Sequence, residues 1–122
     1  IIGLDLDGSI DFINHTAEKI LGYEREELIG ANMHKTIQHK HADGSEYLFK
    51  DSPVFHSIKL GATNKTNEEI FWTKKQQQTK VSLVCTPLKD DGITSGLLVL
   101  FSDKDDGQID DIADKIANIQ KQ

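Results

Sequence analysis

The stretch DDGITSGLLVLF, residues 90–101, combines a turn signal with the longest apolar run of the chain. In the segment before it, residues 79–88, Val81, Leu83 and Cys85 share one side and the residues between them share the other. Two β-rich segments joined by Asp-Asp-Gly predict an antiparallel hairpin. Because the closing LLVLF is apolar on both faces, we expect its strand in the middle of a sheet, with a cover on each face.

The segments before this hairpin are expected to supply the other elements. A strand at Ile1–Leu6 turns at Asp7-Gly8-Ser9 into a second strand, Ile10–Ile13, and Ser52-Pro53 is the clearest helix start. Short helices, several of them ended by glycines, are expected at residues 16–21, 24–29, 32–38 and 52–60. Three longer strands are expected at residues 68–73, 79–88 and 95–102. Such short helices are stable only when packed on a sheet. The order predicts an α+β fold, with helices on one face of an antiparallel sheet.

Composition narrows the class of protein. The chain has 122 residues, enough for one core, with 37% hydrophobic and 28% charged residues, as in soluble globular domains. A net charge of −6 argues against binding to nucleic acid or to a membrane surface, and no apolar run approaches the ~20 residues of a membrane span. The single cysteine, Cys85, predicts a reducing, cytoplasmic environment. Because the chain begins at Ile1 and not at Met, we expect it to be part of a longer protein.

The C-terminal segment has a different pattern. Ile109, Ile112, Ile116 and Ile119 are separated by polar residues at the spacing of one helix face. This spacing fits the seam of a coiled coil, and it equally fits an amphipathic helix that folds back on its own sheet. Both interpretations stay open at the level of sequence.

A series of short motifs runs in order from Ile1 to about Asp103. They are Asp5-Leu6-Asp7-Gly8, Asn14, the helix Ala17–Gly22 with Leu21-Gly22-Tyr23, Glu27-Leu28-Ile29-Gly30, His39–Gly44, Ser52-Pro53, Thr86-Pro87-Leu88, Asp91-Gly92 and Gly96–Asp103. In this order and spacing the chain resembles a PAS domain. The resemblance implies a five-stranded antiparallel sheet in the spatial order 2-1-5-4-3, with the strand of residues 95–102 at its centre.

The resemblance also implies a role and a domain organisation. PAS domains are sensory or interaction modules, attached to output domains such as kinases, cyclic-dinucleotide enzymes, chemoreceptors and transcription activators, as in two-component systems of bacteria. We therefore expect a sensor domain at residues 1–103 and a signalling helix or linker at 104–122, homodimeric in the parent protein. Asp103 matches the Asp-x-Thr that often ends the last strand, but Asp105 stands in place of the threonine. Some relatives with a similar histidine-rich loop carry cysteine where this chain has Ser52.

Catalysis is not expected. Cys85 lies in a strand without a nearby histidine, and neither a Gly-x-Ser-x-Gly elbow nor a phosphate-binding loop occurs. A light-sensing flavin site of the family needs a reactive cysteine in an Asn-Cys-Arg-like motif, where this chain has Asn32-Met33-His34. Photochemistry through a cysteine adduct is therefore excluded, and the absence of any cofactor is the leading expectation.

Two histidine hypotheses remain beside that expectation. His56 lies on the Ser52–Leu60 helix, which supplies the axial ligand in haem-binding relatives, so a haem-based redox or gas sensor is the alternative; the ring could equally face solvent. His34, His39 and His41 do not have the spacing of a zinc site, and we expect them to order their loop by hydrogen bonds.

The leading hypothesis is a non-catalytic sensory module that responds to a small molecule or partner and relays the response to an output domain. A module that only binds protein, with a filled core, is a further alternative. If a small ligand binds, we expect it between the Ser52 helix and the sheet, at Phe55, His56, Ile58, Trp72 and Val84. The signal-relay candidates are Asp103, Ile109, Ile112, Ile116 and Ile119. Either Phe71 or the pair Ile70 and Trp72 faces the helices.

Overall fold

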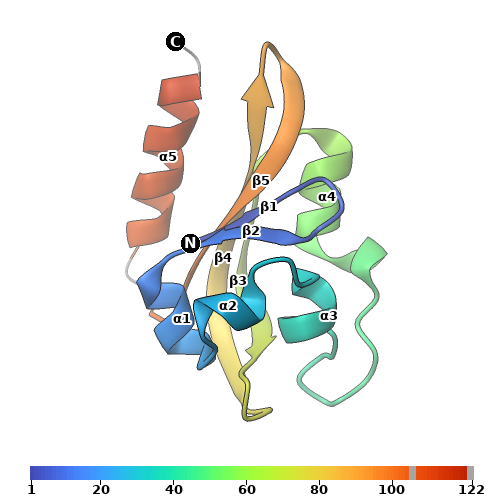
Figure 1. Ribbon diagram of the computed structural model, residues 1–122. Coiled ribbons are helices and arrows are strands. Elements are labelled where there is room, and N and C mark those ends of the chain that lie inside the picture. Colours follow the sequence, from blue (N-terminus) through green and yellow to red (C-terminus); the bar gives the residue numbers. More distant parts are fainter. Residues whose placement is uncertain (105–106, 121–122) are drawn as a thin grey trace.

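A computed structural model describes residues 1–104 and 107–120 and shows one sheet between two unequal layers of helices (Figure 1). The strands are β1 (Ile2–Leu4), β2 (Ile10–Ile13), β3 (Asn64–Trp72), β4 (Gln78–Asp90) and β5 (Ile93–Ser102). The helices are α1 (His15–Leu21), α2 (Arg25–Leu28), α3 (Met33–Ile37), the 3₁₀ turn η1 (Phe49–Asp51), α4 (Pro53–Leu60) and α5 (Gln108–Gln120). Helices α1 to α4 lie on one side of the sheet and α5 lies alone on the other.

The sheet has the strand order β2-β1-β5-β4-β3, with every neighbouring pair antiparallel, which confirms the predicted order. Strand β5 is central and pairs with β4 from Ser82↔Ser102 to Asp90↔Ile93. The turn between them places Asp91 and Gly92 at φ of 52° and 79°. Two successive residues with positive φ match the twist of a tight hairpin, which explains why Asp-Gly marks it.

The main core lies between the sheet and helices α1 to α4. It contains Val81, Leu83 and Cys85 on β4 and Leu97, Val99 and Phe101 on β5, together with apolar residues of β1, β2 and the helices. Phe71 is fully buried, and its ring meets that of Phe101 edge to face at 5.0 Å. Phe71 therefore faces the helices, which resolves the choice that the sequence left open on β3.

Helix α5 covers the opposite, outer face of the sheet. Ala113 is 4% exposed and packs against Val84 on β4 and Leu100 on β5, with Ile109 and Ile116 partly buried beside them. The two-sided apolar pattern of the central hairpin is thereby explained, because each face has its own cover. Of the two interpretations of the isoleucine spacing, the structure has the helix folded back on its own sheet.

Helix boundaries follow local capping. The Asn14 side chain accepts a hydrogen bond from the Ala17 amide at the start of α1, and the Ser52 hydroxyl does the same for Phe55 at the start of α4. Strand β3 begins at Asn64, four residues before the expected start at residue 68, because Asn64 already pairs with Cys85. Its polar beginning has no apolar alternation from which a strand could be predicted.

Gly96 marks a close approach of two central strands. A Cβ at this position would lie 2.8 Å from the carbonyl oxygen of Leu4 on β1. A side chain there would push β1 away from β5, so the glycine is required by packing between neighbouring backbones.

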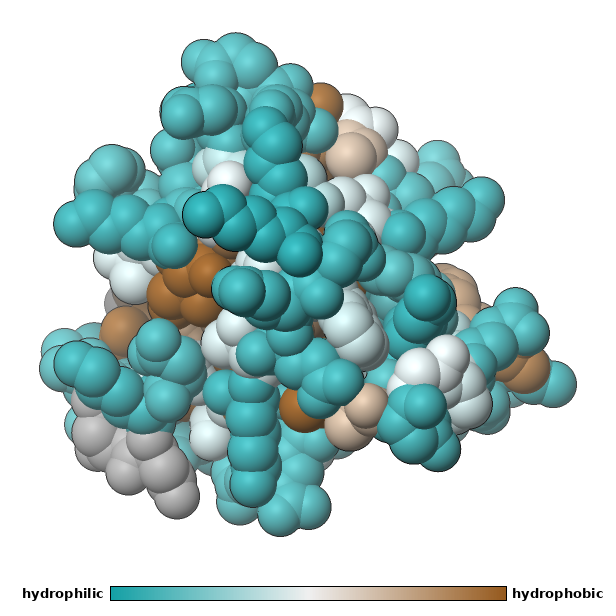
Figure 2. Space-filling model, turned by 90° about the horizontal axis from the view of Figure 1, so that it is seen from below, coloured by the Kyte–Doolittle hydropathy of each residue, from teal (hydrophilic) through white to brown (hydrophobic). Residues whose placement is uncertain are grey.

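The end of the molecule formed by α1, α2 and the β3–β4 turn is mostly hydrophilic, with small apolar patches (Figure 2). In the described residues no helix is both long and apolar enough to cross a membrane.

Candidate functional site

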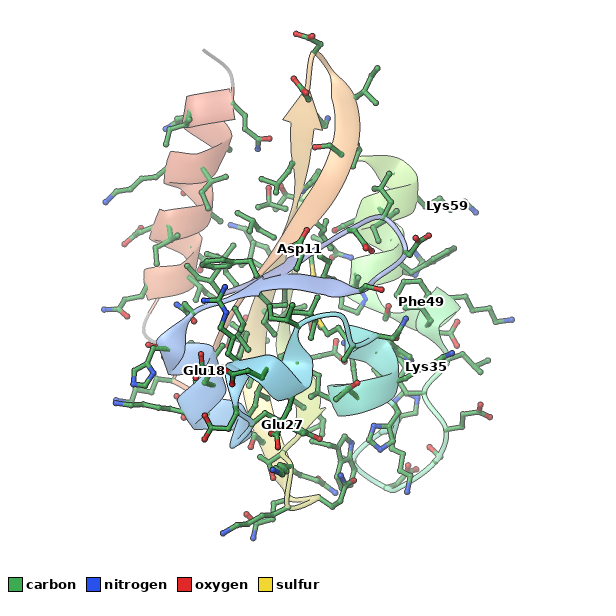
Figure 3. The ribbon with its side chains drawn as sticks, viewed as in Figure 1. Asp11, Glu18, Glu27, Lys35, Phe49 and Lys59 are labelled. Atoms are coloured by element: carbon green, nitrogen blue, oxygen red, sulfur yellow. The ribbon has the colours of Figure 1, made fainter. Side chains whose placement is uncertain are left out.

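The five residues expected to line a ligand pocket do not come together. Phe55 and Ile58 are half-buried on α4, and Phe55 packs edge to face against Phe49 at 5.5 Å, beside the start of that helix (Figure 3). Trp72 lies at the far end of β3, where its Nε1 donates to the Lys40 carbonyl at 2.9 Å. Val84 belongs to the outer face beneath α5. Adjacent positions on a strand point to opposite faces, and this separates Val84 from the α4 side of the sheet.

His56 does not fit the haem alternative. Its side chain is exposed on α4, and its nearest aromatic contact is the neighbouring Phe55 ring at 5.9 Å. An axial ligand must direct a ring nitrogen into an enclosed apolar pocket. Lys59, one turn along the same helix surface, also points away from the body of the protein (Figure 3).

A buried polar cluster lies instead between α3, the following loop and β3. His34 and Gln38 come from α3 and its C-cap, Tyr47 from the loop and Glu69 from β3, and all four are buried, Gln38 completely. The Nε2 atom of His34 lies 2.5 Å from the Tyr47 carbonyl oxygen, and its Nδ1 lies 3.4 Å from Gln38 Oε1. The cluster thereby attaches the loop to α3.

Burial sets the electrostatics of this cluster. It raises the pKa of Glu69, while hydrogen bonds from Tyr47 and Gln38 and the nearby His41 and His34 act in the opposite direction. Burial and the adjacent Glu69 carboxyl also raise the pKa of the Tyr47 hydroxyl, which stays a proton donor at neutral pH. Glu69 is 7% exposed and reaches the surface beside the loop that follows α3.

That place is a cleft of about 360 Å³ between the loop and β3. It is lined by Lys40, His41, Ala42, Asp43, Tyr47, Glu68, Glu69 and Ile70. The rings of His41 and Tyr47 stack at 4.3 Å with 18° between their planes, which holds one wall of the cleft in place. Of the three histidines expected to order this loop by hydrogen bonds, His34 does so through its ring, whereas His41 acts by ring stacking and His39 Nδ1 is buried without a hydrogen-bond partner in the described residues.

Metal binding has no support in the described part of the chain. No group of three or more His, Cys, Asp or Glu side chains there is arranged to hold an ion. His39 contributes to packing, with its ring 6.1 Å from the Trp72 ring. Burial lowers the pKa of His39, assisted by Lys40 and His34, and this favours a neutral ring.

The signal-relay candidates lie at the start of α5 and along it. Ile109 and Ile116 pack on the sheet, whereas Ile112 and Ile119 are 39% and 70% exposed. Asp103 is exposed after β5, and Asp105 lies outside the described residues. The helix is attached at both ends by polar contacts, from Lys65 to Asp110 at 3.1 Å and from Gln120 to the Pro87 carbonyl at 3.2 Å.

Sequence reasoning missed the cluster at Glu69. Neither Gln38 nor Glu69 was predicted to be functional, because each stands among polar residues on a segment without apolar alternation. The only available signal was the order of Glu68, Glu69, Ile70 and Phe71 on β3. If Phe71 faces the core, the period of two directs Glu69 to the core as well.

Comparison with protein families agrees with this architecture. The family model described as PAS domain matches residues 1–106, so the chain belongs to the PAS domain family. PAS domains are in general sensory or regulatory modules of signalling proteins, and nothing in the comparisons indicates catalytic activity. Comparison with curated protein sequences gives no significant match.

Solved structures with the same fold have low sequence identity to this chain. A PAS domain from Colwellia psychrerythraea has a TM-score of 0.66 at 20% identity, covering 84% of this chain and 83% of that one. The PAS domain of nitrogen regulation protein NR(II) from Vibrio parahaemolyticus has a TM-score of 0.64 at 16% identity, over 83% and 84% of the two chains. A light-oxygen-voltage domain has a TM-score of 0.69 at 18% identity, over 98% of this chain and 84% of that one.

Proposed function

We propose that this domain is a non-catalytic sensory module of a larger signal-transduction protein, and that residues 104–122 relay its state to an output domain. The observation that carries the proposal is α5, which is docked on the outer face of the sheet through one small side chain, Ala113, and flanking isoleucines. The helix directly follows β5, the strand at the centre of the sheet. A structural change on either face of β5 is therefore expected to alter the position of the start of α5.

The docking of α5 is suited to a two-state response. Only Ala113 among its described residues is fully buried, and its polar attachments at Asp110 and Gln120 are on the surface. Exposed ion pairs of this kind contribute about 0–1 kcal/mol. A ligand or partner that prefers one position of α5 shifts the equilibrium by its difference in affinity for the two states.

The exposed isoleucines indicate what α5 contacts in the parent protein. Ile112 and Ile119 form the half of the apolar face that the sheet leaves uncovered. We propose that the parent is a homodimer in which this half packs against the second copy, with a kinase, cyclic-dinucleotide enzyme, chemoreceptor or transcription activator as the output domain. A buried, reduced Cys85 is compatible with a cytoplasmic location for the module.

The test is a charge placed under α5. In Ala113→Glu the new carboxylate faces Val84 and Leu100, and an unpaired buried charge costs several kcal/mol, so α5 should detach. Hydrogen exchange of residues 108–120 should lose its protection while that of β1, β4 and β5 persists, and the output activity of the parent protein should change.

Asn118→Glu is the matched control, because the same charge stands at an exposed position of the same helix outside the isoleucines proposed to contact the second copy. It should leave hydrogen exchange of the isolated chain unaltered. If Ala113→Glu detaches α5 and the output activity of the parent stays at the wild-type level, the relay role is wrong.

A further inference from the structure

A bulge in β3 determines which of two adjacent glutamates faces inward at the cleft. Thr66 pairs with Leu83 on β4. Glu69, three residues later, pairs with Val81, which is only two residues from Leu83, so β3 contains one extra residue here. Such a bulge changes which side chain points to a given face of the sheet. Glu69 therefore takes the inward position that Glu68 would have in a regular ladder, and it lines the cleft.

The Glu69 carboxyl is the buried charged group of this cleft. The other charged residues of the lining are exposed. Within the described residues, no Lys, Arg or His side chain forms an ion pair with Glu69. The two neighbouring carboxylates have partners: Asp43 accepts from the Ser45 hydroxyl at 2.6 Å, and Glu68 pairs with Lys80 at 3.6 Å. Glu69 is thus a buried carboxyl that faces a cleft without a counter-charge from the protein.

The charges around the cleft favour a cation as its occupant. The carboxylates of Asp43, Glu68 and Glu69 line it together with one lysine of the described residues, Lys40, which is exposed. A small anion would be repelled by these carboxylates. A cation supplies the counter-charge that an ionised, buried carboxylate needs.

The walls of the cleft are held in place by hydrogen bonds to the loop backbone. The Nε1 atom of Trp72, at the end of β3, donates to the Lys40 carbonyl at 2.9 Å. The Nε2 atom of Gln78, at the start of β4, donates to the Ala42 carbonyl at 2.6 Å. Because these bonds already order the loop, a ligand does not have to order it on binding, which lowers the cost of binding.

The size and the apolar part of the lining restrict the ligand further. A volume of about 360 Å³ is at the lower end of the range of ligand sites. Ile70 and Ala42 are the aliphatic residues of the lining. These features favour a short hydrocarbon body over a large aromatic cofactor. A primary ammonium group adds three N–H donors in a compact cation, which suits a single buried carboxylate.

We propose that the cleft binds a small aliphatic amine, with its ammonium group on the Glu69 carboxylate and its hydrocarbon chain against Ile70 and Ala42. The site lies apart from the pocket that the sequence predicted beside α4. Amine binding is a property of the domain alone; its use as the sensed signal rests on the proposed function.

The experiment is a ¹H–¹⁵N NMR titration of the chain of 122 residues with n-butylamine hydrochloride, at a fixed pH near neutrality and constant chloride concentration. Saturable shifts are expected for the amides of residues 40–47 and 68–72, with a Kd in the millimolar range for a ligand of so few atoms. 1-Butanol, which has the same hydrocarbon chain without the charge, should not reproduce them. Identical shifts with both compounds, or no saturable shift at these residues, would overturn the proposal.

Glu69→Gln keeps the shape of the side chain and removes its charge, so the affinity for n-butylamine should fall by about tenfold or more. Glu46→Gln is the matched control, because Glu46 is exposed on the same loop and does not line the cleft. This control should bind the amine as the wild type does. Equal affinities of the two variants would contradict the role of Glu69.

A third variant covers the case in which Glu69→Gln does not fold. Ala42→Leu fills the cleft from an exposed loop position and leaves the Glu69 carboxyl in place. It should abolish the saturable shifts, and wild-type affinity in this variant would place the amine elsewhere. Because these titrations need no output domain, their result is independent of the test of α5.

Discussion

Two individual residues show how a single side chain, or its absence, constrains this domain. Gly96 lets the backbones of β1 and β5 approach each other closely. A Cβ added at this position would lie only 2.8 Å from the carbonyl oxygen of Leu4. Glu69 introduces a carboxyl group into a region that otherwise excludes water, where it needs Tyr47 and Gln38 as partners. The first residue is required by packing, and the second reduces stability when it ionises.

Gly96→Ala should destabilise the domain by about 1–3 kcal/mol, because a methyl group forced against a strand carbonyl displaces the central pair of strands. Urea unfolding followed by circular dichroism measures this loss. Ser95→Ala, at the exposed neighbouring position, should stay within about 0.5 kcal/mol of the wild type. Equal midpoints for the two variants would contradict the close approach of β1 and β5.

At the scale of elements, the two covers of the sheet are unequal. Helices α1 to α4 bury the larger core, whereas α5 covers a small cluster centred on Val84, Leu100 and Ala113. The sheet and its helical face should therefore fold without the C-terminal helix, which places the boundary of the sensor domain at residue 103 as we propose.

Removal of residues 104–122 should leave a cooperatively folding domain that has lost about 2–4 kcal/mol of stability. Val84 and Leu100 are each 1% exposed under α5, and burial of each such side chain contributes about 1.5–3 kcal/mol. The conformational entropy lost when α5 is ordered on the sheet offsets part of this gain. Chemical denaturation of the shortened chain measures the difference. An unfolded product would mean that α5 is part of the sensor domain, and an unchanged midpoint would mean that its docking is energetically negligible.

At the scale of the whole molecule, stability is linked to pH through Glu69. Its pKa in the folded state is raised above the ordinary 4.5, mainly by burial, so the folded state binds this proton more tightly than the unfolded state. The stabilisation of the folded state by this bound proton is fully present below pH 4.5. It is lost as the pH rises through the raised pKa of Glu69.

Thermal melting of the wild type and of Glu69→Gln, from below pH 4.5 to above the raised pKa of Glu69, isolates the contribution of this residue to the pH dependence of stability. The difference in Tm should be constant below pH 4.5 and should grow in favour of Glu69→Gln at higher pH, because the amide cannot ionise. Glu68→Gln, the same substitution at the exposed neighbouring position of β3, is the matched control. A Tm difference that is independent of pH would contradict the burial of an ionisable Glu69.

The amino-acid sequence by itself determined the central hairpin and the helix start at Ser52, and the resemblance to the PAS family implied the strand order. The hairpin and this helix start follow from local signals, since turn residues, alternation and caps act over a few neighbouring positions. Only the tertiary structure decided that α5 folds back on the sheet, that Val84 faces away from α4, and that Gln38, Tyr47 and Glu69 meet. Those contacts join separate segments of the chain, and a buried polar residue such as Gln38 interrupts the apolar pattern from which burial is predicted.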